Sequence, residues 1–267
     1  WKRPQCFLEL GVPKYAFLVS AGNLDSMVAH YTVAKQRRSK DAYSPGEKIG
    51  LRPDRAVTVY TKILRSLCSD TPILIGGLEA SLRRFAHYDY WSDSVRPSVL
   101  EESGADLLMY GMGEREIIQI AQAFREGKTL EEMRDIRGTC YLVAPEETPF
   151  GCVECPGWEQ IAKDKAAYAK ATRIEMDHQD EITGRTLIQR QKHKMLVQNP
   201  PMEALTTEEM VWVYSLPYMR TYHPSYESQG GVPAIREIKF SLISNRGCFG
   251  GCSFCALTFH QGRTVQV

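Results

Sequence analysis

The chain has 267 residues, of which 43% are hydrophobic and 24% are charged, as in an ordinary globular protein. Its 33 Lys and Arg nearly balance its 32 Asp and Glu, so the formal net charge is +1 and no basic footprint for nucleic acid is visible. No apolar run approaches the ~18 residues that a membrane span needs, and the first residues do not resemble a signal peptide. We therefore expect a cytoplasmic protein without a membrane partner.

Both ends of the chain suggest a longer protein. The sequence begins at Trp1 without a methionine and stops at Val267, 12 residues after the last cysteine. We therefore expect it to be part of a longer polypeptide.

The first half of the chain alternates strand-like and helix-like segments. Short apolar runs predict strands at 15–20, 72–76, 107–110 and 139–143. Apolar residues at helical spacing lie between these runs, and the predicted helix starts are Asn23 or Asp25 for the first helix and Asp54 for the second. This alternation predicts an α/β domain over residues 3–143, with a parallel sheet and helices on its faces.

Glycine-bearing loops follow three of these predicted strands, at 21–23, 76–77 and 111–113. In open parallel sheets the ligand site lies at the carboxyl ends of the strands, and glycine lets a ligand approach the backbone closely. The sequence therefore predicts a binding edge here. The alternative is that these glycines only make tight turns.

The character of the chain changes between Ala144 and Val232, where prolines recur. One amphipathic helix is predicted from about Trp158 to Asp180. Beyond it, the alternating apolar and charged residues of Ile235–Ile243 predict a strand that leads directly into a cysteine-rich loop. We expect this strand to open a separate α/β unit.

Three of the eight cysteines lie close together as Cys248, Cys252 and Cys255, with C-x-x-x-C-x-x-C spacing. Glycines at 247, 250 and 251 remove steric bulk and permit unusual backbone angles, as a loop around an inorganic cluster requires. Electron-transfer clusters usually take four cysteines, so three thiolates would leave one iron open. The alternatives are a zinc site with a fourth ligand, or a reactive dithiol.

A strand followed by C-x-x-x-C-x-aromatic-C resembles the signature of the radical S-adenosylmethionine (SAM) superfamily. Further runs are similar to the YgiQ family within it, and they extend through nearly the whole chain. These runs are 20–27, 41–46, 52–55, 76–84, 87–93, 218–226 and 246–252. Members of that family are much longer, in agreement with the expected longer polypeptide.

The resemblance implies an enzyme and a three-part organisation. It assigns residues 1–144 to a cobalamin-binding-like, Rossmann-like domain, 145–234 to a connecting region, and 235–267 to the start of the radical SAM domain with its first strand and cluster loop. Cys248, Cys252 and Cys255 would bind a [4Fe–4S] cluster, and Phe254 would lie by the adenine of SAM. An external electron donor would reduce the cluster for radical chemistry on an unknown substrate. The alternative is a non-catalytic iron–sulfur or zinc protein.

Cobalamin is a separate question. The glycine loops at 76–77 and 111–113 are similar to those of cobalamin-binding-like domains that precede many radical SAM barrels. The Asp-x-His-x-x-Gly motif that ligates cobalt in some of them is absent from this sequence. The sequence leaves cobalamin open as a cofactor but does not predict it.

Two further groups of residues have open interpretations. Cys152 and Cys155 form a C-x-x-C, which suggests half of a metal site, a redox pair, or simply two exposed cysteines in a loop. We expect the third. A polar cluster near a strand end either faces a ligand or forms a salt-bridged surface loop. Its members are Glu79, Arg83, Arg84, His87, Asp89 and Asp93.

Overall fold

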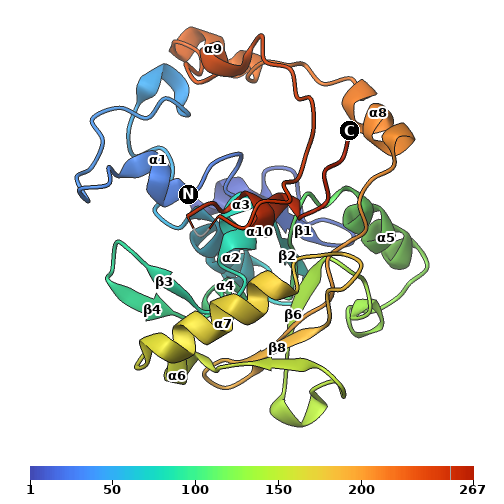
Figure 1. The fold of residues 1–267 in the computed structure, drawn as a ribbon. Helices are drawn as coiled ribbons and strands as arrows, with labels where there is room; N and C mark the ends of the chain where they lie inside the picture. The colour runs from blue at the N-terminus through green and yellow to red at the C-terminus, as the bar shows by residue number, and fades with distance from the viewer. Residues whose placement is uncertain (253) are drawn as a thin grey trace.

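The computed structural model describes residues 1–252 and 254–267. A seven-stranded sheet lies at its centre, with helices on both faces (Figure 1). In spatial order, the strands are β1 (Phe17–Val19), β2 (Ile73–Ile75), β5 (Leu107–Met109), β6 (Thr139–Val143), β9 (Met195–Gln198), β8 (Leu187–Arg190) and β7 (Val153–Cys155). A separate hairpin pairs β3 (His87–Asp89) with β4 (Ser94–Arg96).

The strands β1, β2 and β5 form one parallel part of the sheet, and β7 and β8 also pair in parallel. Successive side chains of a strand point to opposite faces. In β2, Ile73 and Ile75 accordingly enter one core cluster and Leu74 enters the other. Leu18 of the edge strand β1 is 60% exposed and belongs to neither cluster. These strands confirm the predicted α/β class.

Helices cover the two core clusters on opposite faces of the sheet. The cluster around Ile75 includes residues of α2 and α4, and the cluster around Leu74 includes residues of α5. The helices are α1 (Ser26–His30), α2 (Ala56–Leu67), α3 (Gly77–Leu82), α4 (Val99–Ser103), α5 (Glu114–Arg125), α6 (Trp158–Ile161), α7 (Lys165–Asp177), α8 (Thr207–Ser215), α9 (Ile235–Ile238) and α10 (Leu257–Gln261). Short 3₁₀ helices lie at Pro4–Leu8, Pro45–Glu47, Glu131–Met133, Pro145–Glu147 and Pro224–Gln229.

The predicted parallel sheet needs a correction at its fourth strand. β6 runs antiparallel to β5, with Leu108 opposite Cys140, and β9 is antiparallel to β6 in turn. The sheet then continues through β8 and β7, so strands on both sides of residue 144 share one sheet. An apolar run such as 139–143 shows that a strand is buried, but it does not show the strand's direction. The sheet is therefore mixed, and it continues past the expected domain end at 144.

Two predicted helix starts have different outcomes. Asp25 caps α1, and its side chain accepts hydrogen bonds from Met27 N and Val28 N, as predicted. The prediction that Asp54 caps α2 is wrong, because Arg55 stands before the helix in a left-handed conformation. The first amides of α2 donate instead to side chains distant in sequence. Ala56 N donates to Ser26 Oγ at 3.1 Å, and Val57 N to Glu79 Oε1 at 3.0 Å.

The long helix predicted over Trp158–Asp180 is two helices. Between α6 and α7 the chain leaves the helical path at Asp164, whose side chain accepts a hydrogen bond from Ala166 N and opens α7. An Asp that bonds to a nearby amide favours a new helix start over continuation. Ile161, Ala167 and Ala171 pack with the β3–β4 hairpin.

The strand predicted over Ile235–Ile243 is also wrong. Ile235–Ile238 form α9, and residues 239–245 belong to no strand in the described part of the chain. A strand needs a neighbour for its backbone groups, and Leu242 is 96% exposed at this point. Figure 1 shows the chain after α8 reaching away to α9 before it returns to α10. The bond from Ala234 N to Ala42 O ties this excursion to the N-terminal third.

Within residues 1–252 and 254–267, no helix is long and apolar enough to cross a bilayer.

Candidate metal centre

The glycine loops after β1 and β2 meet at one edge of the sheet, as predicted. Gly77 has a φ of +79°, which favours glycine, and a Cβ there would lie 3.3 Å from Ser20 Cβ. Gly76 makes a similarly close contact with Met109 at the end of β5. A Cβ on Gly76 would lie 3.4 Å from the Met109 carbonyl oxygen. The carboxyl ends of the three parallel strands therefore form one tightly packed edge.

Glu79 connects two helix starts at this edge. The Glu79 carboxylate is 2% exposed and accepts hydrogen bonds from Ser26 N at 2.8 Å and Val57 N at 3.0 Å. It thereby caps two helices, where the aligned amides favour a negative charge. Arg83, which projects from the end of the same helix as Glu79, forms an ion pair with Asp25. Glu79 and Arg83 of the predicted polar cluster thus have structural partners.

The remaining members of that cluster lie in two settings. Asp89 is 3% exposed and pairs with Arg55 at 2.5 Å, and Asp93 accepts from the Tyr88 hydroxyl. Arg84 and His87 instead line a pocket beside α10. The cluster is therefore neither a single ligand site nor a surface loop.

The cysteine loop is anchored by the residue that precedes it. Arg246 is 6% exposed and pairs at 2.5 Å with Glu114, the first residue of α5. Its Nε donates to the Tyr214 hydroxyl at 2.9 Å, and its guanidinium lies 5.0 Å from the centre of that ring. Burial alone would lower the pKa of Arg246, but the bonds to Tyr214 and Glu114 raise it above its usual value. A buried, charge-assisted contact therefore fixes the start of the loop to the sheet edge.

Backbone pairing closes the other end of the loop. Arg246 exchanges two backbone hydrogen bonds with Gln266, at 3.0 and 2.9 Å, and Cys248 N donates to Gly262 O at 3.2 Å. Gly247 has a φ of +77°, and a Cβ at this position would stand 2.0 Å from the Thr264 carbonyl oxygen. Only glycine fits there without a shift of the backbone.

The three cysteines lie on this loop. The point where a Cβ on Gly250 would stand is 3.3 Å from Cys248 Sγ and 3.8 Å from Cys252 Sγ. Cys255 N donates to Cys252 O at 3.2 Å, which folds the third cysteine back toward the second. All eight cysteines, which lie within the described residues, are free thiols. The absence of a side chain at Gly250 therefore leaves two of the sulfurs on one side of a small turn.

Three cysteine thiols are suitable ligands for an iron–sulfur cluster, although their sulfurs do not converge on one point in this structure. Among the residues that the structure describes, no group of three His, Cys, Asp or Glu is placed to hold a metal ion. Thiolate is the ligand that iron–sulfur clusters take, and Cys252 is exposed while Cys248 and Cys255 are half-buried. Phe254 is 90% exposed, and its place by the adenine of SAM stays a prediction.

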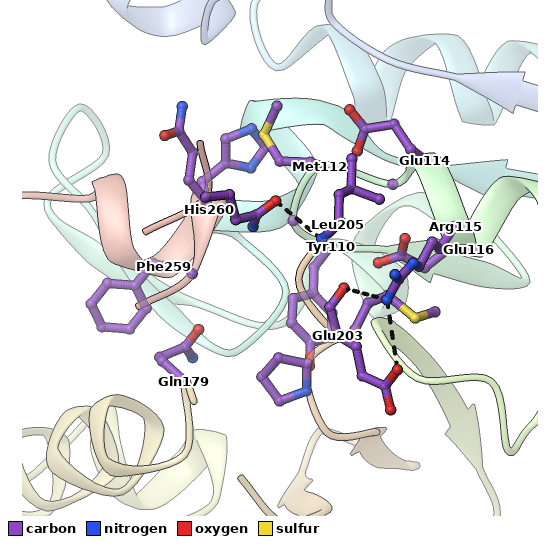
Figure 2. A pocket seen from close by; sticks show the side chains of 17 residues that line it. Tyr110, Met112, Glu114, Arg115, Glu116, Gln179, Glu203, Leu205, Phe259 and His260 are labelled. Atoms are coloured by element: carbon purple, nitrogen blue, oxygen red, sulfur yellow. Dashed lines mark hydrogen bonds and ion pairs between the residues drawn. The ribbon is translucent and has the colours of Figure 1, made fainter. Parts of the chain in front are cut away.

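After the cysteines, α10 returns to the sheet edge and covers it. The His260 carbonyl oxygen is 3.4 Å from the Cβ position of Gly111, and the Phe259 carbonyl accepts from Arg84 Nη1 at 3.3 Å. Between α10 and the loop after β5 lies an open pocket with an empty volume of about 510 Å³. Figure 2 shows Phe259 and His260 across this pocket from Arg115 and Glu116. The cysteine loop thus adjoins the edge that the glycine loops predicted.

Glu116 in the wall of this pocket makes stability depend on pH. Burial raises the pKa of this 3% exposed carboxyl from 4.5 to about 8. The folded state favours the protonated acid, so this stability is fully present below pH 4.5 and is lost as the pH rises through about 8. We expect Glu116→Gln to remove about 2–5 kcal/mol of pH dependence between these limits.

Chemical denaturation between pH 5 and pH 9 measures this effect. Glu159→Gln, at an exposed position of α6, is the matched control and should retain the pH dependence of the unmodified protein. Parallel pH profiles for Glu116→Gln and the unmodified protein would show that Glu116 is ionised in the fold.

Cys152 and Cys155 do not form a dithiol site. Residues three apart in a strand point to opposite faces, and Cys155 enters the cluster around Ile75 while Cys152 packs on the cluster around Leu74. Cys155 is 1% exposed, and burial raises the pKa of its thiol well above the usual value. The expectation of two exposed cysteines is therefore wrong, because Cys155 is a core residue and Cys152 is half-buried.

Sequence reasoning missed the distant partners of the two arginines that hold this region together. Arg246 was part of a motif run, but its partner Glu114 lies 132 residues away in sequence. Arg84 reaches Gln198 across 114 residues. A signal did exist for Arg246, because a charged residue stands between an apolar segment and a glycine–cysteine turn.

Comparison with known proteins identifies the family. Residues 1–241 match the family described as Radical SAM N-terminal. A UPF0313 protein of Clostridium botulinum (strain ATCC 19397 / Type A) is 54% identical over 266 residues, covering 100% of this chain and 41% of that protein. A UPF0313 protein of Clostridium perfringens (strain 13 / Type A) is 50% identical over 266 residues, covering 99% of this chain and 40% of that protein.

The chain thus spans about two-fifths of the length of these curated relatives. No solved structure matches it. The family match covers most of the chain and confirms the resemblance that the cysteine spacing and the motif runs indicated. The chain therefore belongs to the Radical SAM N-terminal family, and with it to the radical SAM superfamily.

Proposed function

We propose that the full-length protein is a radical SAM enzyme in which Cys248, Cys252 and Cys255 bind three irons of a [4Fe–4S] cluster. The observation that carries the proposal is the cysteine loop itself, held at the carboxyl edge of the sheet by the buried Arg246–Glu114 pair. Two of its sulfurs already flank the open space at Gly250. Three protein ligands leave one iron free for SAM.

When bound, such a cluster would pass one electron from an external donor to SAM. The chemistry it would supply is cleavage of a carbon–sulfur bond of SAM to methionine and a 5′-deoxyadenosyl radical, which would take a hydrogen atom from the substrate. The chain's own residues hold the geometry. Arg246 and the Gly247 turn fix the loop, and Phe254 would cover the adenine. The packing of α10 against Gly111 holds the segment after the loop at the sheet edge.

Anaerobic reconstitution of the full-length protein with iron and sulfide, followed by electron paramagnetic resonance, tests the proposal. We expect a reduced [4Fe–4S] signal that shifts when SAM is added, because SAM would bind the iron that lacks a cysteine. A signal that SAM leaves unchanged would indicate a closed, non-catalytic cluster. Tight stoichiometric zinc with no iron uptake would indicate a structural zinc site.

A further inference from the structure

A second pocket lies on the other side of α10, next to the cysteine loop. It is open, has an empty volume of about 760 Å³, and is bounded by the turn after α3, by α7 and by α10. Ala256, the residue directly after Cys255, is part of its wall. A molecule in this pocket would therefore be adjacent to the proposed cluster ligands.

Arg84 is a buried cation in the wall of this pocket. It is 2% exposed, and its hydrogen-bond partners among the described residues are all neutral. Nε donates to Gln198 Oε1 at 2.5 Å, and Nη1 donates to the carbonyls of Ser81 at 2.6 Å and Phe259 at 3.3 Å. Within the described residues Nη2 is buried without a hydrogen-bond partner. A guanidinium keeps its charge in proteins, and a buried charge without an opposite charge is costly.

Aromatic contacts offset only part of that cost. The Arg84 guanidinium carbon lies 4.7 Å from the ring centre of Tyr110 and 5.9 Å from that of Phe259. Such contacts contribute less than the charge-assisted bond that an oxygen anion forms with a guanidinium. An anion held at the Arg84 guanidinium would supply the opposite charge that the described residues do not give it.

The other polar groups of the pocket do not supply this anion. Glu175 forms no ion pair with Arg84 within the described residues, and burial raises the pKa of its carboxyl to about 8 although the Arg84 charge lowers it. Burial also lowers the pKa of His87 to about 4, so its ring is neutral. His87 Nδ1 donates to the Phe85 carbonyl at 3.1 Å, which leaves Nε2 as a buried acceptor that has no partner in the described part of the chain.

The remaining wall is mostly apolar, from Leu82, Phe85, Ile161 and Ala171. We propose that this pocket binds the substrate, and that Arg84 receives a carboxylate carried on an apolar body. The inference rests on the proposed function and adds a substrate class to it, because a carboxylic acid held at Arg84 lies beside the cysteine loop. His87 Nε2 would accept a hydrogen bond from a hydroxyl or amino group of the same molecule.

Isothermal titration of the iron-free full-length protein tests this assignment without any need for the cluster. The probes are benzoate, a carboxylate on an apolar body, and methionine, which carries the carboxylate of SAM. We expect benzoate to bind, and Arg84→Met to raise its Kd about 10- to 100-fold, the value of a hydrogen bond to a charged group. Arg134→Met is the matched control, because Arg134 stacks on Tyr141 and lines a different pocket.

A second variant keeps the test decisive if Arg84→Met does not fold. Ala256 is exposed at the pocket wall, so Ala256→Trp should fold normally and weaken benzoate binding by narrowing the pocket. Benzoate that fails to bind, or that binds both variants as it binds the unmodified protein, would overturn the assignment. Arg84-dependent binding of methionine in preference to benzoate would also overturn it, because the anion would then belong to SAM. None of these outcomes depends on whether the protein cleaves SAM.

Discussion

Cys252→Ala is expected to abolish SAM cleavage by the reconstituted full-length protein. Mutation of a residue that hydrogen-bonds to a metal ligand typically lowers metal affinity or activity about 10- to 100-fold. Loss of a ligand itself should therefore lower the activity more than 100-fold. Cys252 is exposed, and its replacement should leave the fold intact. Iron content and the yield of 5′-deoxyadenosine measure the effect.

Cys68→Ala is the matched control for this prediction. Cys68 is a half-buried thiol directly after α2, outside the cysteine loop. We expect this variant to take up iron and to cleave SAM like the unmodified protein. Equal iron uptake and cleavage by Cys252→Ala would remove Cys252 from the ligand set.

Gly247→Ala is expected to displace the cysteine loop and reduce iron uptake sharply. The new Cβ would stand 2.0 Å from the Thr264 carbonyl oxygen, so backbone must move. The positive φ adds about 1–2 kcal/mol for an L-residue, and overpacking costs a further 1–3 kcal/mol or so. Thermal unfolding of the iron-free protein and iron content after reconstitution report the two consequences.

Gly251→Ala provides the comparison within the same loop. Its Cβ would meet open space and its φ is not in the left-handed range, so the Tm of the iron-free protein should stay unchanged. If Gly247→Ala left both the Tm and the iron content unchanged, the close contact between Gly247 and Thr264 would not support the loop.

The parts of this fold that are visible in the sequence are those that local pattern controls. The run Ile73–Ile75 is buried on both faces and reads as a strand, and Asp25 caps the helix that it precedes. The spacing of the cysteines is informative because three thiols at fixed intervals are rare by chance, and it resembles the signature of the superfamily. Glycines at strand ends likewise mark the edge where the loops meet.

The parts that the sequence hides depend on distant partners. The capping of α2 by Ser26 and Glu79 leaves no local signal, and Asp54 has the sequence features of a cap but binds His30 and Tyr31 instead. The antiparallel course of β6 depends on its pairing with β9, more than 50 residues later. The apolar segment before Arg246 alternates like a strand, yet residues 239–245 pair with no strand that the structure describes.

Product analysis after reduction of the reconstituted full-length protein tests the central claim most directly. With dithionite as the electron source and SAM as the only added substrate, we predict 5′-deoxyadenosine and methionine in equal amounts, with the radical taking its hydrogen atom from buffer or protein. Their formation should depend on Cys248, Cys252 and Cys255, because these residues would hold the cluster that cleaves the carbon–sulfur bond. A fully reconstituted and reduced cluster that leaves SAM intact would contradict the account.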